Sequence, residues 1–522
     1  MKRFNTTGIC RPHEHYMVDI TERVRIIGKM VSDGDYFCIN RGRQYGKTTT
    51  LTSLKGYLED VGLCVFFISL ESVDNAYLET ESRMGAILLR LLSSCVKRKK
   101  TRNLDAECAE ALLTFQQSHS EECAVYDLRE FLIDWCAMNG SGIVLCIDEV
   151  DQASNHVSFL KFLGALRDMY LHRGEDAAFQ SVILAGVYDI KNLKLKMRSE
   201  DQHQYNSPWN IAVPFDIDMS LDASGIAGML AEYKSERGRS FDERSVAQMI
   251  RDYTAGYPFL VSRICQIIDA ESLMWDKEGV LKAVNAVLIE RNTLFDNMIK
   301  HLSDYPELKS VLQAILLSGE TRTFNPDEKY IQIASMLNYI TNRDGKVAVM
   351  CRIMETRLYN LFISEQENTA YFKQGISDRQ QFVHDNRLDM KCLMERFACH
   401  VNQTFSLDKD HKFLEENGRQ IFLTYLRPII NGVGSYHIEA QTRDMDRMDV
   451  VIDYMGRQYV VELKIWRGNA YNERGEEQLC RYLESFDLQE GYLLSFCFNK
   501  NRRSGVLPPV QLRGRTLIEA IV

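Results

Sequence analysis

The feature that most limits how this chain can fold is a glycine-containing loop between an apolar run and a helix pattern. Residues 36–41 form a short apolar run, typical of a buried strand. The loop 42–50 follows directly, and apolar side chains then recur at helical spacing through residues 51–58. A strand, a loop containing Gly-Lys-Thr and a helix form a corner where backbone amides can bind phosphate.

The residue types in this loop suit a nucleotide bound together with Mg²⁺. Lys47 would reach the β- and γ-phosphates, and Thr48 would bind Mg²⁺. The full pattern has a glycine where Arg41 stands, so Arg41 and Arg43 are expected either to contact phosphate or to pair with neighbouring acids. The candidate nucleotide-binding residues are Arg41, Gly42, Arg43, Gln44, Tyr45, Gly46, Lys47, Thr48, Thr49 and Asp148.

A second apolar run, residues 142–147, ends in two acids, Asp148 and Glu149. Carboxylates at the carboxyl end of a buried parallel strand lie where Mg²⁺ and the attacking water belong beside a phosphate loop. Asp148 would hold Mg²⁺, and Glu149 would polarise the water. An acid after a strand is often only a helix cap, but the two motifs in this order favour a nucleotide site.

Two further apolar runs, residues 63–70 and 181–187, predict additional strands of the same parallel sheet. Beyond them, Gly256-Tyr257-Pro258 precedes an apolar helix pattern. These residues resemble the AAA-like ATPases of the STAND and archaeal-ATPase group. The resemblance implies an α/β P-loop NTPase core over residues 1–213 and a helical lid over residues 214–298.

Residues 299–372 resemble a winged helix, a common appendix to this ATPase group. Two helical patterns precede an Asp344-Gly345 turn between two strand-like runs. Such a unit either contacts DNA or packs between domains and relays the nucleotide state. The small number of Lys and Arg residues on the second helix favours packing.

The last third of the chain contains paired acids and a lysine on a predicted hairpin that turns at Met455-Gly456. Side chains alternate between the faces of a strand, so Glu462 and Lys464 share one face, and Asp449 on the partner strand can face Glu462. Two converging carboxylates repel each other unless a divalent cation neutralises them. A neighbouring lysine can orient water and stabilise negative charge, so the group suits metal-dependent phosphodiester cleavage. The alternative to a catalytic site is an ordinary strand whose Glu462 and Lys464 side chains face solvent.

Residues 380–522 resemble the PD-(D/E)xK nuclease superfamily, with Asp449, Glu462 and Lys464 as its core residues. A helix over residues 413–426, expected to end at Arg427-Pro428, carries the first acid, Glu415, with Glu416 as a rival. Gln478 and Tyr482 match the Gln-x-x-x-Tyr element of the RecB-like branch. The nuclease resemblance and the ATPase motifs together give the candidate catalytic residues Glu149, Glu415, Asp449, Glu462, Lys464, Gln478 and Tyr482. They give the candidate metal ligands Thr48, Asp148, Asp449 and Glu462.

Composition limits the remaining possibilities. The net charge of −9 argues against a broad basic coat for nucleic acid, although a local groove is compatible with it. There is no signal-peptide pattern or long apolar stretch, and the 14 cysteines are scattered, so we expect a cytoplasmic protein with reduced thiols and no membrane contact.

The motifs together predict an ATP-regulated, Mg²⁺-dependent nuclease, with a role in defence against foreign DNA as a family-level expectation. The alternative is an ATP-dependent signalling switch, or a nucleic-acid-binding scaffold with little or no cleavage. DNA is the favoured partner. The choice between DNA and RNA, between endo- and exonuclease action, and between a monomer and a homo-oligomer stays open.

Overall fold

The computed structural model describes the chain except residues 188–208, 318–321, 365–369, 386, 405–414, 431–433, 442–446, 466–475, 478, 485–486 and 498–503. The chain forms two compact units, which are described separately. The first comprises residues 1–220 with 335–338, and the second residues 221–334 with 339–522. Within the described residues, no helix combines the length and apolar character needed to cross a membrane.

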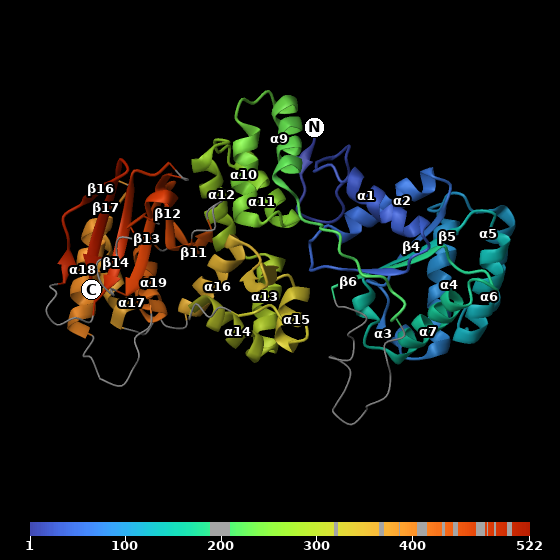
Figure 1. The fold of residues 1–522 in the computed structure, drawn as a ribbon. Helices are drawn as coiled ribbons and strands as arrows, with labels where there is room; N and C mark the ends of the chain where they lie inside the picture. Colours follow the sequence, from blue (N-terminus) through green and yellow to red (C-terminus); the bar gives the residue numbers. More distant parts are fainter. Residues whose placement is uncertain are drawn as a thin grey trace. The chain divides into compact units, whose positions relative to one another are not determined.

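A parallel sheet lies at the centre of the first unit (Figure 1). Its described strands are ordered β3-β6-β5-β4. They are β3 (Phe37–Asn40), β4 (Cys64–Ser69), β5 (Ile143–Asp148) and β6 (Ser181–Gly186). Every residue of β5 and β6 is buried. Their continuous apolar runs fit this position, because a parallel sheet is covered on both faces. The predicted strands and their parallel arrangement are confirmed.

Helices cover both faces of this sheet. Figure 1 shows α1 (Thr21–Ser32) and α2 (Lys47–Asp60) on one side and α3 (Asn75–Leu78) and α7 (Val157–Leu171) on the other. The remaining elements are β1 (Arg3–Phe4), β2 (His15–Tyr16), α4 (Glu81–Lys97), α5 (Ala106–Ser118), α6 (Val125–Met138) and the short 3₁₀ helix η1 (Val150–Gln152). A Cβ at Gly28 would lie 2.4 Å from the ring of Tyr57, so this glycine permits α1 to pack closely on α2.

The second unit begins with four helices: α9 (Ala223–Arg237), α10 (Glu243–Thr254), α11 (Pro258–Ala270) and α12 (Lys277–Ile289). The side chains of Asp222, Asp242 and Asp276 accept hydrogen bonds from amides in the first turns of α9, α10 and α12. Gly256 adopts a positive φ of 71°, and a Cβ there would lie 2.1 Å from the Leu221 carbonyl oxygen. Only glycine fits at this position, directly before the helix that starts at Pro258.

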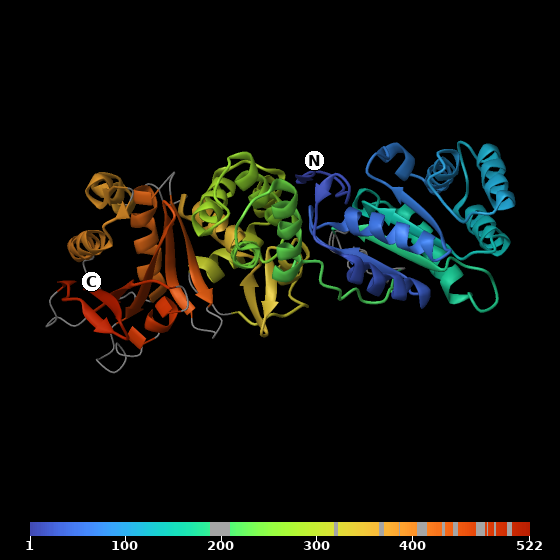
Figure 2. The same cartoon turned by 90° about the horizontal axis from the view of Figure 1, so that it is seen from above.

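Four more helices and a hairpin follow. The helices are α13 (Thr293–Asp304), α14 (Pro306–Leu317), α15 (Lys329–Met336) and α16 (Arg352–Ser364), and the hairpin joins β7 (Ile340–Arg343) to β8 (Lys346–Val349). Asp344 and Gly345 both have positive φ, at 52° and 79°, which confirms the predicted Asp-Gly turn. Figure 2 shows the hairpin, in yellow, projecting from the helices.

The C-terminal part is a mixed sheet ordered β11-β12-β13-β14-β17-β15, with β16 paired to β17. Its strands are β11 (Gly434–Gln441), β12 (Arg447–Tyr454), β13 (Arg457–Ile465), β14 (Glu490–Phe496), β15 (Gly505–Val506), β16 (Val510–Leu512) and β17 (Arg515–Ile521). The strands β11, β12 and β13 are antiparallel neighbours, whereas β13, β14 and β17 run parallel. The turn at Met455-Gly456 has positive φ at both residues and confirms the predicted hairpin.

Helices α17 (Ala370–Phe382), α18 (Met390–Thr404) and α19 (Glu415–Ile430) accompany this sheet, together with the short strands β9 (Val383–His384) and β10 (Arg387–Leu388). The predicted helix end at Arg427-Pro428 is wrong, because α19 continues through Pro428 to Ile430. Tertiary packing supports the extra turn: a Cβ at Gly375 of α17 would lie 2.7 Å from the Pro428 ring. Helix α17 also crosses the boundary expected at residues 372–380.

Candidate functional site

The first candidate site is the loop between β3 and α2. Gly46 has a φ of 81° in the left-handed region and forms the N-cap of α2. Lys47 and Thr48 therefore occupy the first turn of the helix, where backbone amides lack intrahelical partners. The sequence folds this way because glycine adopts a positive φ without steric cost. The arrangement suits an anion at the helix N-terminus.

The Lys47 ammonium group is held inside this loop. Its Nζ donates hydrogen bonds to the carbonyl oxygens of Arg41 at 2.8 Å and Gly42 at 3.1 Å. Burial lowers the pKa of Lys47, whereas the acids Glu149, Asp151 and Asp148 act to raise it. The Lys47 ammonium group is therefore attracted by the acids at the carboxyl end of β5. It also lies at the loop whose backbone amides are expected to bind phosphate.

Thr48 and Asp148 meet directly. The Thr48 hydroxyl donates a hydrogen bond of 2.8 Å to Asp148 Oδ2, and the Glu149 amide donates one of 3.0 Å to Asp148 Oδ1. Asp148 is 3% exposed, so the carboxylate is fixed at the edge of the site. A hydroxyl and a carboxylate in contact form an oxygen donor set that fits Mg²⁺.

Glu149 occupies a strained position beside this pair. Its φ of 55° is uncommon for a residue with a side chain. Burial raises the pKa of Glu149, and the Lys47 charge acts in the opposite direction. A carboxylate with a raised pKa is a stronger proton acceptor, which suits a residue that activates water.

Asp151 is a further part of this site that was not assigned a role from the sequence. Its Oδ2 accepts a hydrogen bond of 2.6 Å from the Val187 amide at the end of β6. A Cβ at Gly186 would lie 3.0 Å from Asp151 Oδ1, so the glycine leaves room for this contact. The sequence shows a third acid shortly after β5, which could have suggested a role for Asp151. Its partner, Val187, follows β6, a strand that is far away in the sequence.

The other loop residues have varied surroundings. The Arg41 guanidinium donates to the carbonyl oxygen of Ile217 at 2.9 Å and lies over the ring of Phe215. Burial lowers the pKa of Arg41. The Thr49 hydroxyl accepts a hydrogen bond of 3.1 Å from the Cys10 amide. Of the remaining candidates, Gly42 and Tyr45 are buried, Gln44 is half-buried with a φ of 58°, and Arg43 is exposed.

The second candidate site lies on the C-terminal sheet. Val450 of β12 is paired with Val461 of β13. Asp449 precedes Val450, and Glu462 follows Val461, so the antiparallel register brings their backbones to neighbouring positions. The expected pairing of these two positions therefore agrees with the strand register.

Glu462 and Lys464 form a buried ion pair. Lys464 Nζ lies 3.3 Å from Glu462 Oε1. Glu462 is 3% exposed and Lys464 is 8% exposed. Buried charges are costly unless they are paired or bind an ion, so this pair is an uncommon feature for a strand. On the neighbouring strands, the Ser495 hydroxyl donates a hydrogen bond of 2.7 Å to Glu519 Oε1.

Ser495 and Glu519 extend the polar face that carries the ion pair. Ser495 is aligned with Lys464 in the parallel register of β13 and β14, so the two side chains share a face. These two residues were not identified from the sequence. Each is flanked by apolar residues in its strand, and only the pairing of the strands brings them to the face that carries Glu462 and Lys464.

Several predicted residues cannot be placed fully. Gln478 and the side chains of Glu415 and Asp449 lie outside the described residues, although the backbones of Glu415 and Asp449 belong to α19 and β12. Tyr482 is fully buried against Val451 and Val460. Among the described side chains, no group of three or more His, Cys, Asp or Glu residues forms a metal-binding cluster. The Asp449 side chain is not among those described.

A buried acid on the same strand was also missed. The Tyr253 hydroxyl of α10 donates a hydrogen bond of 2.8 Å to Asp453 Oδ2, and Asp453 is 1% exposed. Burial raises the pKa of Asp453 to about 6, although hydrogen bonds from Tyr253 and Gln458 act to lower it. The sequence could have pointed to Asp453, because its even spacing from Asp449 places the two acids on one face of β12.

The raised pKa of Asp453 predicts a pH-dependent stability. The folded protein retains this proton between pH 3.8 and about 6, where the unfolded chain releases it. The stabilising effect of protonation is thus complete below pH 3.8 and is lost as the pH rises through about 6. We expect Asp453→Asn to raise the free energy of unfolding at pH 8 by up to about 3 kcal/mol.

Chemical denaturation of wild type and Asp453→Asn at pH 8 and pH 4.5 measures this effect. The difference between the two proteins should shrink at pH 4.5. Asp304→Asn, at an exposed position, is the matched control and should show no such trend. A variant that is less stable than wild type by the same amount at both pH values would contradict the prediction.

Comparisons with solved structures show low similarity. A Walker-type ATPase of Pyrococcus abyssi has 14% identity and a TM-score of 0.47, over 68% of this chain and 99% of that chain. The ORC2 protein of Aeropyrum pernix, in ADPNP–ADP complexes, has 12% identity and a TM-score of 0.38, over 70% of this chain and 98% of that chain. No curated protein matches the sequence at a significant level.

A family model gives the clearest result. The model for an AAA-like domain matches residues 13–365, which is more than half of the 522 residues. The match contains the loop before α2, the acids at the carboxyl end of β5 and directly after it, and the helices α9–α12. The α/β architecture with a parallel sheet agrees with it. The chain therefore belongs to the AAA-like domain family.

Proposed function

We propose that this protein binds and hydrolyses ATP at the loop before α2, and that the nucleotide controls a Mg²⁺-dependent nuclease in the C-terminal sheet. The observation that best supports ATP binding is the contact of Thr48 with Asp148 at 2.8 Å, beside the buried Lys47. A cation, a hydroxyl and a carboxylate meet at a helix N-terminus, as phosphate transfer with Mg²⁺ requires.

Each residue has a defined task in this proposal. Thr48 and Asp148 would hold Mg²⁺, which supplies charge neutralisation at the phosphates. Lys47 exchanges its loop carbonyl partners for phosphate oxygens, and the amides of the first turn of α2 bind the same anion. Glu149 accepts a proton from the attacking water. Asp151 positions the end of β6 through the Val187 amide.

The nuclease part of the proposal rests on the buried pair Glu462–Lys464 and on the register position of Asp449. Asp449 and Glu462 would hold Mg²⁺, which supplies charge neutralisation at the scissile phosphate. Lys464 orients water and stabilises the negative charge that develops during cleavage. Glu415, Gln478 and Tyr482 are kept as supporting candidates. Residues 380–522 would then form a PD-(D/E)xK-like domain and residues 299–372 a winged-helix-like one.

A contact within the second unit supports control of the nuclease by the lid. Tyr253 lies at the end of α10, shortly before Gly256 and the start of α11. Its hydroxyl donates a hydrogen bond to Asp453 on β12. Asp449 belongs to the same strand. A change in the position of α10 would act directly on the strand that carries a proposed metal ligand.

A cleavage assay tests the proposal as a whole. The full chain is incubated with supercoiled plasmid, linear duplex DNA or RNA, with Mg²⁺ and with or without ATP. We expect cleavage that needs Mg²⁺ and changes with ATP, and that EDTA stops. The absence of cleavage on all substrates, at enzyme concentrations that hydrolyse ATP, would contradict the nuclease assignment.

One observation favours the alternative of a switch or scaffold. Arg41 occupies the position of the first loop glycine and is engaged with Phe215 and Ile217. A loop altered in this way could hold ATP and turn it over slowly. ATP turnover near background, with DNA binding but no cleavage, would support this alternative over the nuclease.

A further inference from the structure

Residues 213–220 form the segment that leads from the first unit to residue 221, where the second unit begins. The segment is held at both ends. Val213 forms an isolated β-bridge with Phe37, and Arg23 of α1 donates a hydrogen bond of 2.8 Å to the Ser220 carbonyl oxygen. Between these two points the segment has no helix or strand. Its position therefore depends on side-chain contacts rather than on a ladder of backbone hydrogen bonds.

Arg41 supplies the contacts in the middle of this segment. Its guanidinium donates a hydrogen bond of 2.9 Å to the Ile217 carbonyl oxygen and lies 5.5 Å from the centre of the Phe215 ring. Phe215 is 9% exposed and stacks on Phe37 of β3. The Arg41 side chain thus covers an aromatic residue that would otherwise be more accessible to solvent.

The same residue also belongs to the loop that is expected to bind phosphate. The Arg41 amide donates a hydrogen bond of 3.2 Å to the Gly186 carbonyl oxygen at the end of β6. Its own carbonyl oxygen accepts the 2.8 Å bond from Lys47 Nζ. A phosphate that draws Lys47 away from this carbonyl oxygen therefore acts on the residue that holds the segment.

The charges around the Arg41 guanidinium favour its exchange between two partners. Burial lowers the pKa of this group, whereas Tyr45, Asp218 and Asp216 act to raise it. Both aspartates are exposed, so water screens their attraction. The direct hydrogen-bond partner in the segment is a neutral carbonyl oxygen, and hydrogen bonds between arginine and phosphate are stronger than bonds of that kind. A bound polyphosphate therefore competes with the segment for Arg41.

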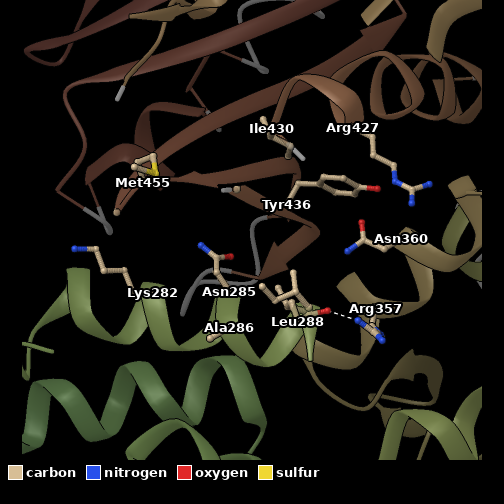
Figure 3. A pocket seen from close by; sticks show the side chains of 13 residues that line it. Lys282, Asn285, Ala286, Leu288, Arg357, Asn360, Arg427, Ile430, Tyr436 and Met455 are labelled. Atoms are coloured by element: carbon tan, nitrogen blue, oxygen red, sulfur yellow. Dashed lines mark hydrogen bonds between the residues drawn. The ribbon is translucent and has the colours of Figure 1, made fainter. Parts of the chain in front are cut away.

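A second arginine makes similar contacts away from any proposed site. Arg357 of α16 lines a cavity of about 510 Å³ in the second unit and donates a hydrogen bond to the Leu288 carbonyl oxygen (Figure 3). It also lies over the ring of Phe295. Its two partners belong to the helices α12 and α13, so Arg357 links regular elements. Arg41 differs because it links an irregular segment to a loop where an anion is expected.

We propose that Arg41 is a latch operated by the nucleotide. Without nucleotide, Arg41 holds segment 213–220 on the phosphate loop. When ATP and Mg²⁺ bind, its guanidinium moves to phosphate oxygens and releases the segment, which leads to lid helix α9. The two roles expected for Arg41 from the sequence then belong to two states of one residue. This inference rests on ATP binding at Lys47, the first part of the function proposed above, and is independent of the nuclease.

Limited proteolysis with chymotrypsin tests the latch, because this protease cleaves after an accessible phenylalanine. The full chain is digested with Mg²⁺, with and without the non-hydrolysable analogue AMP-PNP, and mass spectrometry quantifies the new N-terminus at Asp216. We expect AMP-PNP to raise the initial rate of cleavage after Phe215 by about 3- to 10-fold in the wild type. Arg41→Ala should be cleaved about 10-fold faster than wild type without nucleotide, and AMP-PNP should change that rate little.

Two further variants separate the latch from general loosening. Arg25→Ala changes an exposed arginine on α1 and should behave as the wild type. Arg23→Ala removes the anchor at Ser220 but keeps Arg41. It should be cleaved faster than the wild type, and AMP-PNP should still raise its rate of cleavage.

Calorimetric titration of the same proteins with AMP-PNP distinguishes failure of the latch from failure of ATP binding. If the wild type binds AMP-PNP and its cleavage after Phe215 is unchanged or slower, the latch is overturned while ATP binding stands. If the wild type does not bind AMP-PNP, the ATP function is wrong and the latch fails with it. A folded Arg41→Ala variant that is cleaved at the wild-type rate also overturns the latch. If this variant does not fold, the response of the wild type to AMP-PNP decides the question.

Discussion

A Lys47→Ala variant is expected to lose ATP hydrolysis by about 10²- to 10³-fold, with weaker ATP binding. Lys47 is a buried cation in the first turn of α2, and its Nζ lies 2.8 Å from the Arg41 carbonyl oxygen. Burial lowers its pKa while three acids act to raise it. Its removal leaves the phosphate charge without a fixed positive partner. Steady-state phosphate release measures the loss.

Two variants complete this experiment. Lys161→Ala changes an exposed lysine on α7 in the same unit and should hydrolyse ATP at the wild-type rate. Glu149→Gln keeps the shape of the proposed base and removes its charge, so it should bind ATP but hydrolyse it slowly. Wild-type turnover by Lys47→Ala would show that the loop before α2 is not the site of hydrolysis.

Local patterns were sufficient to predict the elements around this loop. The strands β3 and β5 are continuous apolar runs, and Gly46 before Lys47 sets the start of α2. The turns at Asp344-Gly345 and Met455-Gly456 were also predictable, because a two-residue loop that ends in glycine between two strand-like runs is typical of a hairpin. In each case, a few adjacent residues determine the structure.

Contacts between distant segments could not be predicted in this way. Two hydrogen bonds join parts of the chain that are far apart in sequence. One runs from Arg41 to the Ile217 carbonyl oxygen, and the other from Tyr253 to Asp453. The helix α19 continues through Pro428 because α17 packs against it at Gly375. Local rules favour a stop at Pro428, and tertiary packing reverses that preference.

The C-terminal site lies between these two cases. Alternation along β13 correctly placed Glu462 and Lys464 on one face, and the ion pair at 3.3 Å follows from that spacing. Ser495 and Glu519 join the same face only through the parallel order of β13, β14 and β17. Sequence spacing determines neighbours within a strand, whereas the strand order decides which other residues complete the site.

A Lys464→Ala variant is expected to lose nucleic-acid cleavage by about 10²- to 10³-fold while it keeps ATP hydrolysis. Lys464 is 8% exposed and lies against Glu462, and its ammonium group is the proposed source of positive charge for the cleaved phosphate. Removal of its cation also raises the cost of the buried Glu462 carboxylate, so some loss of stability is expected. Gel assays of plasmid cleavage and a melting curve separate the two effects.

Lys464→Met preserves the buried aliphatic stem and removes only the charge, so its loss of cleavage cannot be attributed to a cavity. Lys391→Ala, at an exposed position in α18, is the matched control and should cleave normally. If Lys464→Met folds, hydrolyses ATP and cleaves DNA at the wild-type rate, the ion pair on β13 is structural. In that case cleavage by the wild type must come from another site, and the PD-(D/E)xK assignment fails while the ATPase assignment stands.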